Sequence, residues 1–484
     1  MNSRLSRFVL PVTLLGASAF AFYLALYRPG YLSSGYYLGG LIFLQVLLAA
    51  VWKYEQRFFP LVVTVFLWAG ISIPFSTVWT AGRWPVLAVG AIVGFALYMR
   101  SHRHAFGTFH LTAFSCVLAA LVSASVSSFP LVSSLKALSL LLLFLYGSTG
   151  ARLALAGREE KFFERLLLFI EILVYLSAIS YLILHFPVYG NPNSMGAIMG
   201  VIAVPLLFWG ALTAEGRTER RRKTFAFVLC VGLLFFSQAR SGILAATVTC
   251  TLTCVVLRRY RLLLQGAMVC MGVAVLAIGL TPSEDLLDMP SRRGESSIPS
   301  IFLYKGKEEK GVLGSRGSLW DETATVIHDH PWFGSGFGTT LTDTGDDLGF
   351  GKYASNSTTT REHGDSYLAI LEGVGLLGVV PFFSLVVLLT LKVGKTFRWL
   401  RRTGNLRHCA VPVAMVLAAG LVHAGFEDWL FAVGYYLCVF FWVLAFAFLD
   451  LLPMRVPVTI YRPITDFGFR TLPQNAHAVV APER

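Results

Sequence analysis

Long apolar runs dominate the hydrophobic pattern of the chain. A helix needs about 20 residues to cross roughly 30 Å of hydrocarbon. Runs of about this length cover residues 8–27, 35–52, 58–79, 84–99, 107–128, 131–149, 165–186, 193–213, 224–238, 241–257, 262–280, 366–391, 409–426 and 430–451. A few of them are short, and short runs can pair into one kinked helix or lie in the interface. The pattern therefore predicts an all-α polytopic membrane protein with about 12 to 14 transmembrane helices.

The basic residues predict which loops face the cytoplasm. If the N-terminus is inside, 28 of the 40 Lys and Arg fall on the cytoplasmic side, whereas the short outer loops contain only Arg28, Arg83 and Arg240. This distribution follows the positive-inside rule. The first apolar run continues past Ala19, so we interpret it as an uncleaved helix and not as a signal peptide. Both termini are then expected in the cytoplasm.

The composition supports this class and excludes others. Hydrophobic residues make up 55% of the chain and charged residues only 14%, where a soluble protein has roughly 25% charged residues. So few charges cannot cover a water-exposed surface, and lipid must cover much of the exterior. A soluble enzyme, a disordered chain and a fibre are therefore excluded. The net charge of +13 is explained by the cytoplasmic loops, and nucleic acid is not an expected partner.

One long polar segment divides the chain into four parts. We expect an N-terminal transmembrane bundle over 1–280, an outer loop domain over 281–365, C-terminal transmembrane helices over 366–451 and a cytoplasmic tail over 452–484. Apolar residues recur at helical spacing over 316–330, which predicts an amphipathic helix at the membrane surface. The glycine-rich stretch 331–338 that follows fits either a tight turn packed on the bundle or a phosphate-binding nest.

A few ionisable residues lie where charge is costly in a membrane. Arg240 occupies an outer hairpin, and Lys136 lies near the outer end of the sixth run; either side chain could face a cavity or extend to the surface. His363 stands where the long loop returns to the membrane, next to a helix start expected at Asp365 or Ser366. Its imidazole could accept a proton from a hydroxyl, hold an anion or simply cap the loop.

Other polar residues are interpreted as a rim or as structural. His423, Glu427 and Asp428 form an outer turn that could line the same cavity, whereas Glu171 lies near the basic loops and is expected to be structural. The sequence His328-Asp329-His330 does not predict a metal site, because adjacent residues of a helix point about 100° apart. The seven cysteines lie in or beside apolar runs and indicate neither a metal site nor a disulfide framework.

Several motifs occur in an order that resembles the O-antigen ligase and polymerase superfamily. They span about residues 190 to 380 and comprise Asn191-Pro192-Asn193, Arg240-Ser241-Gly242, Arg316 with Trp320, His330-Pro331 with Gly334 and Gly336, His363 with Tyr367-Leu368, and Glu372 to Gly378. The residue after His363 is Gly364, where the family usually has a small polar residue.

The resemblance implies a glycosyltransferase of the GT-C type that needs no metal or other cofactor. Its donor would be O-antigen on undecaprenyl pyrophosphate and its acceptor the lipid A core oligosaccharide. The reaction would complete lipopolysaccharide at the periplasmic face of the bacterial inner membrane, which makes 281–365 a periplasmic loop. An O-antigen polymerase or a protein O-oligosaccharyltransferase of the same superfamily stays an alternative. A secondary transporter is the alternative without chemistry, although neither inverted repeats nor interrupted helices near the midplane are detected.

The resemblance and the chemistry together suggest roles for the candidate residues. A guanidinium can hold phosphate oxygens bidentately, so Arg240 with Arg316 is expected to bind the pyrophosphate, assisted by Lys136. His363 is expected to orient or deprotonate the acceptor hydroxyl, or else to bind pyrophosphate as a cation. The remaining candidates for the acceptor or the pocket wall are His330, Trp320, Tyr367 and Asn193.

Overall fold

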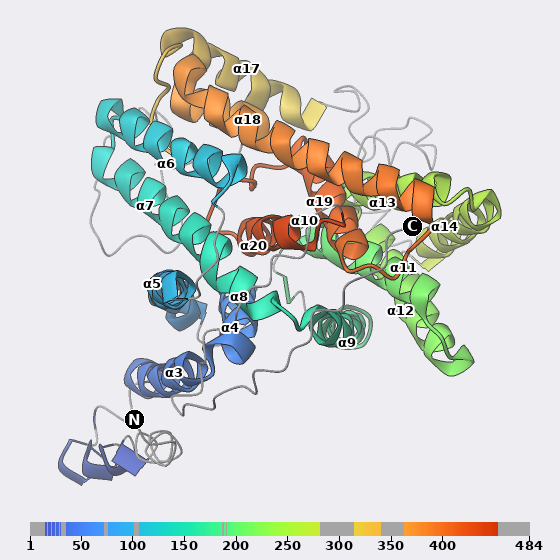
Figure 1. The fold of residues 1–484 in the computed structure, drawn as a ribbon, viewed down its shortest axis with the longest axis horizontal. Coiled ribbons are helices and arrows are strands. Elements are labelled where there is room, and N and C mark those ends of the chain that lie inside the picture. The colour runs from blue at the N-terminus through green and yellow to red at the C-terminus, as the bar shows by residue number, and fades with distance from the viewer. Residues whose placement is uncertain are drawn as a thin grey trace, which may run out of the picture.

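The computed structural model describes residues 35–71, 76–100, 106–185, 188–189, 191–280, 314–339 and 363–453, together with most of 15–30 (Figure 1). Helices make up most of this part of the chain, and none of it forms a strand. The α-helices are α3 (Gly35–Trp52), α4 (Tyr54–Ala69), α5 (Ser76–Arg100), α6 (Thr108–Val126), α7 (Pro130–Tyr146), α8 (Arg152–Leu155), α9 (Glu159–Ala178), α10 (Pro192–Ala197), α11 (Val204–Thr213), α12 (Arg217–Phe236), α13 (Arg240–Val256), α14 (Tyr260–Leu280), α17 (Gly314–Asp329), α18 (Ser366–Thr403), α19 (Ala410–Ala424) and α20 (Tyr436–Leu451).

Three π-helical segments join some of these helices into longer rods. They are η1 (Gly147–Ala151), η2 (Ile179–Ile183) and η3 (Ile198–Ala203). Within the described residues, six rods are long and apolar enough to cross a membrane: Val78–Arg100, Thr108–Val126, Pro130–Leu155, Glu159–Ile183, Pro192–Thr213 and Ser366–Thr403. Shorter apolar helices cover Gly39–Trp52, Arg240–Val256, Ala410–Ala424 and Tyr436–Leu451. The prediction of an all-helical membrane protein is confirmed.

The predicted apolar runs coincide with helices from residue 35 onward. The predicted amphipathic helix over 316–330 is also present, as α17. Half of the first run, 8–27, lies outside the described residues, and so does most of the predicted outer loop domain. How many helices cross the membrane therefore stays a prediction.

The core is centred on α20. Almost every residue of this helix is buried, including Phe441, Trp442 and Phe446. A helix that is apolar on every side needs neighbours on every side, and α20 contacts α4, α7, α8, η1 and α19 (Figure 1). Gly147 in η1 lets Phe446 approach closely, because a Cβ atom there would lie 2.6 Å from the ring. This core fixes the relative positions of the helix ends that form the candidate site.

Helix α18 is broken near its start by Gly375. This residue has φ 67° and ψ −176°, which is a conformation open only to glycine. The N–H groups of Leu376 and Leu377 instead donate to the carbonyls of Pro331 and Trp332, at 2.8 and 3.2 Å. The chain after α17 thus satisfies backbone groups that the break would otherwise leave without partners.

The same segment also bonds to the other side of the break. The N–H groups of Ser335 and Gly336 donate to the carbonyls of Glu372 and Gly373, at 2.9 and 3.1 Å. The glycine-rich stretch is therefore a tight turn packed on the bundle. The alternative, a phosphate-binding nest, is wrong for these two amides because both already donate to carbonyls.

Small residues bring α13 close to the helix that begins at Pro192. A Cβ atom on Gly200 or Gly242 would collide with the backbone of the facing helix. Such small residues let two backbones approach in a membrane, where apolar side chains gain little by leaving lipid. The contact fixes the start of α13, where Arg240 lies.

We expect Gly375→Ala to destabilise the protein by about 2 kcal/mol or more, because alanine is strained at this φ and ψ. The new Cβ atom would also lie 2.5 Å from the N atom of Gly334 and from the carbonyl of Trp332. Thermal unfolding in detergent measures the effect. The matched control is Gly394→Ala in the same helix, where the space is open and alanine favours the helix by about 1 kcal/mol. Equal melting temperatures for the two variants would contradict the account of the break.

Candidate functional site

The starts of α7, α13 and α18 meet the loop between α19 and α20 at one end of the bundle. Ser366, the first residue of α18, holds this loop against the helix by hydrogen bonds. Its buried hydroxyl donates to the carbonyl of Glu427 at 2.6 Å and accepts from the N–H groups of Trp429 and Leu430, at 3.0 and 3.1 Å. The carboxylate of Asp365 caps α18 by accepting from the N–H of Tyr367 at 2.7 Å. The predicted helix start at Asp365 or Ser366 is confirmed.

His363 is held between two carboxylates at this place. Its Nδ1 atom lies 2.6 Å from Oδ2 of Asp428, and its Nε2 atom lies 3.2 Å from Oε2 of Glu372. Residue His363 is only 8% exposed and residue Glu372 only 1%. Asp428 comes from the α19–α20 loop, whereas Glu372 comes from the turn of α18 just before the break. We call these three residues the histidine clamp.

The clamp favours the charged form of His363. Burial by itself lowers the pKa of this imidazole, but the hydrogen bonds and negative charges of Asp428 and Glu372 outweigh that effect and raise the pKa to about 9. His363 is therefore an imidazolium at neutral pH, and each ring nitrogen donates a proton to a carboxylate. In this arrangement neither nitrogen is free to take a proton from a substrate.

Two further cations lie on helices that begin at this end of the bundle. The ammonium of Lys136, on α7, donates to the carbonyl of Gly338 and lies within electrostatic reach of Asp428. Arg240 is the first residue of α13 and is half-buried. The hydroxyl of its neighbour Ser241 lies 3.4 Å from Oε1 of Glu427. The structure thus brings Lys136 and the start of α13 to the same loop that holds His363.

Helix α17 carries two more of the predicted residues. It packs against α18 (Figure 1), which brings Arg316 and Trp320 to this end of the bundle. The side chain of Arg316 lies outside the described residues. Trp320 is half-buried, and its indole N–H is buried without a hydrogen-bond partner in the described part of the chain. His330, directly after α17, is exposed.

The remaining two candidates have local structural contacts. The hydroxyl of Tyr367 donates to the carbonyl of Leu421 at 2.9 Å and so ties α18 to α19. Asn193 lies in the first turn of α10, where its N–H donates to the side chain of Asn191 at 2.8 Å. The side chains of Tyr367 and Asn193 are both half-buried. Their predicted place in an acceptor pocket stays a prediction.

Sequence reasoning missed the two carboxylates that hold His363. Asp428 was expected only at the rim of a cavity, and Glu372 only as part of a motif. A signal for Glu372 did exist, because it is an ionisable residue in an apolar run, directly before the glycines that break the helix. Nothing in the spacing indicated that Asp428 would reach a histidine 65 residues away.

Other buried charges have structural partners. Oε2 of Glu171 lies 3.1 Å from Nε of Arg222, which agrees with the structural role expected for this glutamate. Arg152 forms two hydrogen bonds of 2.6 Å with the carboxylate of Asp450. Among the residues that the structure describes, no group of three or more His, Cys, Asp or Glu is arranged to hold a metal ion.

Residues 225–383 match the model of the O-antigen ligase family. The match covers about a third of the chain and supports membership of the O-antigen ligase superfamily. The matched region begins within α12, ends within α18 and contains Arg240, Arg316, His363 and Glu372. Asp428 of the histidine clamp and the nearby Lys136 lie outside the matched region. None of the curated proteins compared with the chain matches it significantly.

We expect the clamp to make stability depend on pH. A pKa raised to about 9 in the folded state, from about 6.5 in the unfolded chain, stabilises the protein fully below pH 6.5, and this contribution is lost as the pH rises through 9. The melting temperature of the full-length protein in detergent should therefore fall over this range. Asp428→Asn removes one carboxylate and should reduce the fall.

The matched control for this titration is Asp321→Asn, on the exposed face of α17. Its pH dependence should equal that of the unmodified protein. Parallel curves for Asp428→Asn and the unmodified protein would show that His363 does not titrate through its contact with Asp428.

Proposed function

We propose that this protein is an O-antigen ligase. It transfers O-antigen from undecaprenyl pyrophosphate to the lipid A core oligosaccharide and so completes lipopolysaccharide, as a metal-independent glycosyltransferase of the GT-C type. One observation carries the proposal: the segment that matches the O-antigen ligase family contributes Arg240, His363 and Glu372 to one end of the bundle, where Lys136 also lies.

The reaction requires stabilisation of a departing pyrophosphate. As the bond from the sugar to the pyrophosphate oxygen breaks, its electron pair and negative charge stay on the pyrophosphate, and nearby cations favour that state. Arg240 and Arg316 would hold its oxygens bidentately, whereas Lys136 would act as a compact charge. A polytopic protein suits the reaction because donor and acceptor are both lipid-linked.

The protonation of His363 bears on its role. An imidazolium cannot accept the proton of the acceptor hydroxyl, so the clamp supports the cationic role over the base. Asp428 is the more accessible carboxylate, with a side chain 24% exposed against 0% for Glu372. We infer that the hydroxyl proton passes to Asp428, while His363 holds that carboxylate in place and adds positive charge beside the pyrophosphate. Trp320, His330, Tyr367 and Asn193 are proposed to line the acceptor side.

The orientation in the membrane follows from the charges at the two ends of the helices. The ends of α13 and α18 that lie away from His363 lead into basic segments that contain Arg258, Arg259, Arg398, Arg401 and Arg402. The positive-inside rule assigns this end to the cytoplasm. The proposed active site would therefore face the periplasm in the bacterial inner membrane, with both termini in the cytoplasm.

Arg240→Lys tests bidentate binding of the leaving group. The substitution keeps the charge but removes the planar fork, and we expect turnover to fall by about 10²-fold. Transfer of glycan by the purified protein in lipid, with the undecaprenyl pyrophosphate donor, measures it. The matched control is Arg398→Lys at the other end of α18, which should leave turnover unchanged. Near-normal turnover in Arg240→Lys would show that Arg240 does not hold the pyrophosphate bidentately.

The choice of acceptor tests ligase against polymerase. We expect glycan transfer to lipid A core oligosaccharide, no extension of a second lipid-linked glycan, and turnover that persists in excess chelator. A product made only from two lipid-linked glycans would identify a polymerase instead. Activity abolished by chelator and restored by a divalent ion would overturn the metal-independent reaction.

A further inference from the structure

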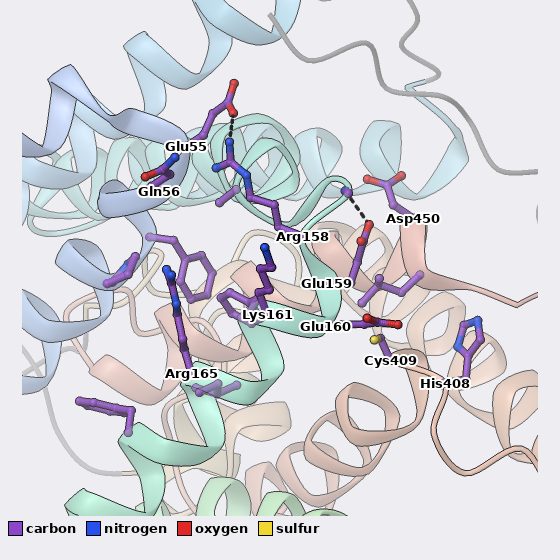
Figure 2. A pocket seen from close by; sticks show the side chains of 18 of the residues that line it. Glu55, Gln56, Arg158, Glu159, Glu160, Lys161, Arg165, His408, Cys409 and Asp450 are labelled. Carbon is purple, nitrogen blue, oxygen red and sulfur yellow. Dashed lines mark hydrogen bonds and ion pairs between the residues drawn. The ribbon is translucent and has the colours of Figure 1, made fainter. Parts of the chain in front are cut away.

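A pocket of about 1150 Å³ lies at the end of the bundle away from His363 (Figure 2). It is formed by the starts of α4, α9 and α19 together with the end of α20, and none of its lining residues belongs to the histidine clamp. Charged residues surround one part of it, whereas aromatic and aliphatic residues line the rest. We call it the inner groove.

The apolar wall of the inner groove runs along two helices. On α4 the lining residues are Gln56, Phe59, Pro60, Val63 and Thr64, and on α9 they include Lys161, Phe162, Arg165, Leu166 and Phe169. Each set recurs every three or four residues and therefore occupies one face of its helix. At 1.5 Å per residue, the wall on α4 extends for about 12 Å along the helix axis. That length reaches from the headgroup level of a leaflet into its acyl chains.

Several charges around the inner groove are already paired within the protein. Arg158 lies 2.8 Å from Oε2 of Glu55, and Asp450 bonds to Arg152. Glu159 accepts from the N–H of Gly157 at 2.8 Å. These contacts neutralise two acidic groups and engage a third, so they limit the repulsion that an anion would meet.

Two cations on α9 face the groove. Lys161 and Arg165 lie one helical turn apart and are exposed, and neither forms an ion pair within the described residues. Figure 2 shows Arg165 on the side where Gln56 lies and Lys161 between Arg165 and Glu160, whereas Glu160 lies beside Cys409. Both cations thus lie on the helix that carries the apolar residues Phe162, Leu166 and Phe169 of the lining.

We propose that the inner groove binds an anionic phospholipid of the adjacent leaflet. Its phosphate would lie beside Lys161 and Arg165, and an acyl chain would lie along Val63, Leu166 and Phe169. Basic pockets between transmembrane helices are suited to such headgroups. A soluble phosphate would leave the apolar wall uncovered, which is why we assign a lipid. The inference does not depend on the proposed glycan transfer.

The test is a titration of the purified full-length protein in detergent with phosphatidylglycerol, followed by native mass spectrometry. Replacing both Lys161 and Arg165 by alanine should weaken binding by about 10- to 30-fold, the loss expected for two cations near an anionic lipid. Val63→Trp places a larger side chain in the inner groove without changing its charge, and it should also weaken binding. Phosphatidylcholine should bind the unmodified protein as weakly as phosphatidylglycerol binds the double variant.

The matched control replaces Lys395 and Arg398, an exposed pair on α18, by alanine and should bind as the unmodified protein does. Equal loss in this control would show that surface charge alone attracts the lipid and would overturn the site. Unchanged binding in the Lys161 and Arg165 variant would do the same. Glycerol phosphate serves as the soluble probe: if it binds as tightly as the lipid, and Val63→Trp has no effect, the site binds phosphate and not a lipid. Unchanged melting temperatures without added lipid confirm that the variants fold.

Discussion

The imidazole of His363 joins segments that are far apart in the chain. It bonds to Glu372 on the first turns of α18 and to Asp428 in the loop between α19 and α20. The two carboxylates favour the cationic form of this buried imidazole, in which each ring nitrogen donates a proton. This charge arrangement holds the loop against the start of α18. It thereby places Asp428 and Glu372 beside one imidazole.

The break of α18 at Gly375 makes this arrangement possible. Because the helix is interrupted there, the segment 331–339 bonds to both sides of the gap. That segment also carries Gly338, whose carbonyl accepts from Lys136. Hydrogen bonds therefore lead from the break to Lys136, which lies within electrostatic reach of Asp428, the partner of His363. The break three residues after Glu372 requires a glycine because of its positive φ.

Much of the fold could be predicted from the sequence, because a helix that crosses lipid must be an apolar run of about 20 residues. The run at 366–391 gave the start of α18, and its N-cap at Asp365 was expected from the residue type. The helical spacing of apolar residues over 316–330 predicted α17. Local patterns of this kind depend on neighbours within a few residues, and the sequence displays those neighbours directly.

The contacts that hold the candidate site could not be predicted in this way. Lys136 donates a hydrogen bond to a backbone carbonyl 202 residues away. A pattern of side chains along the sequence does not indicate such a bond. His363 was expected to be a base or a cation, and only the two carboxylates around it favour the cation. Lys161 and Arg165 follow the positive-inside rule, so the sequence did not distinguish them from the other basic residues expected in cytoplasmic loops. Their place beside an apolar groove follows from the packing of α4, α9, α19 and α20.

The central claim is that the pyrophosphate of the donor binds at the histidine clamp, among Arg240, Lys136 and His363. A cryo-EM structure of the full-length protein in a lipid nanodisc with undecaprenyl pyrophosphate tests it most directly. The account predicts pyrophosphate oxygens about 2.7 to 3.2 Å from the guanidinium of Arg240 and the ammonium of Lys136. A pyrophosphate held elsewhere, with both of these side chains turned away from it, would contradict the account.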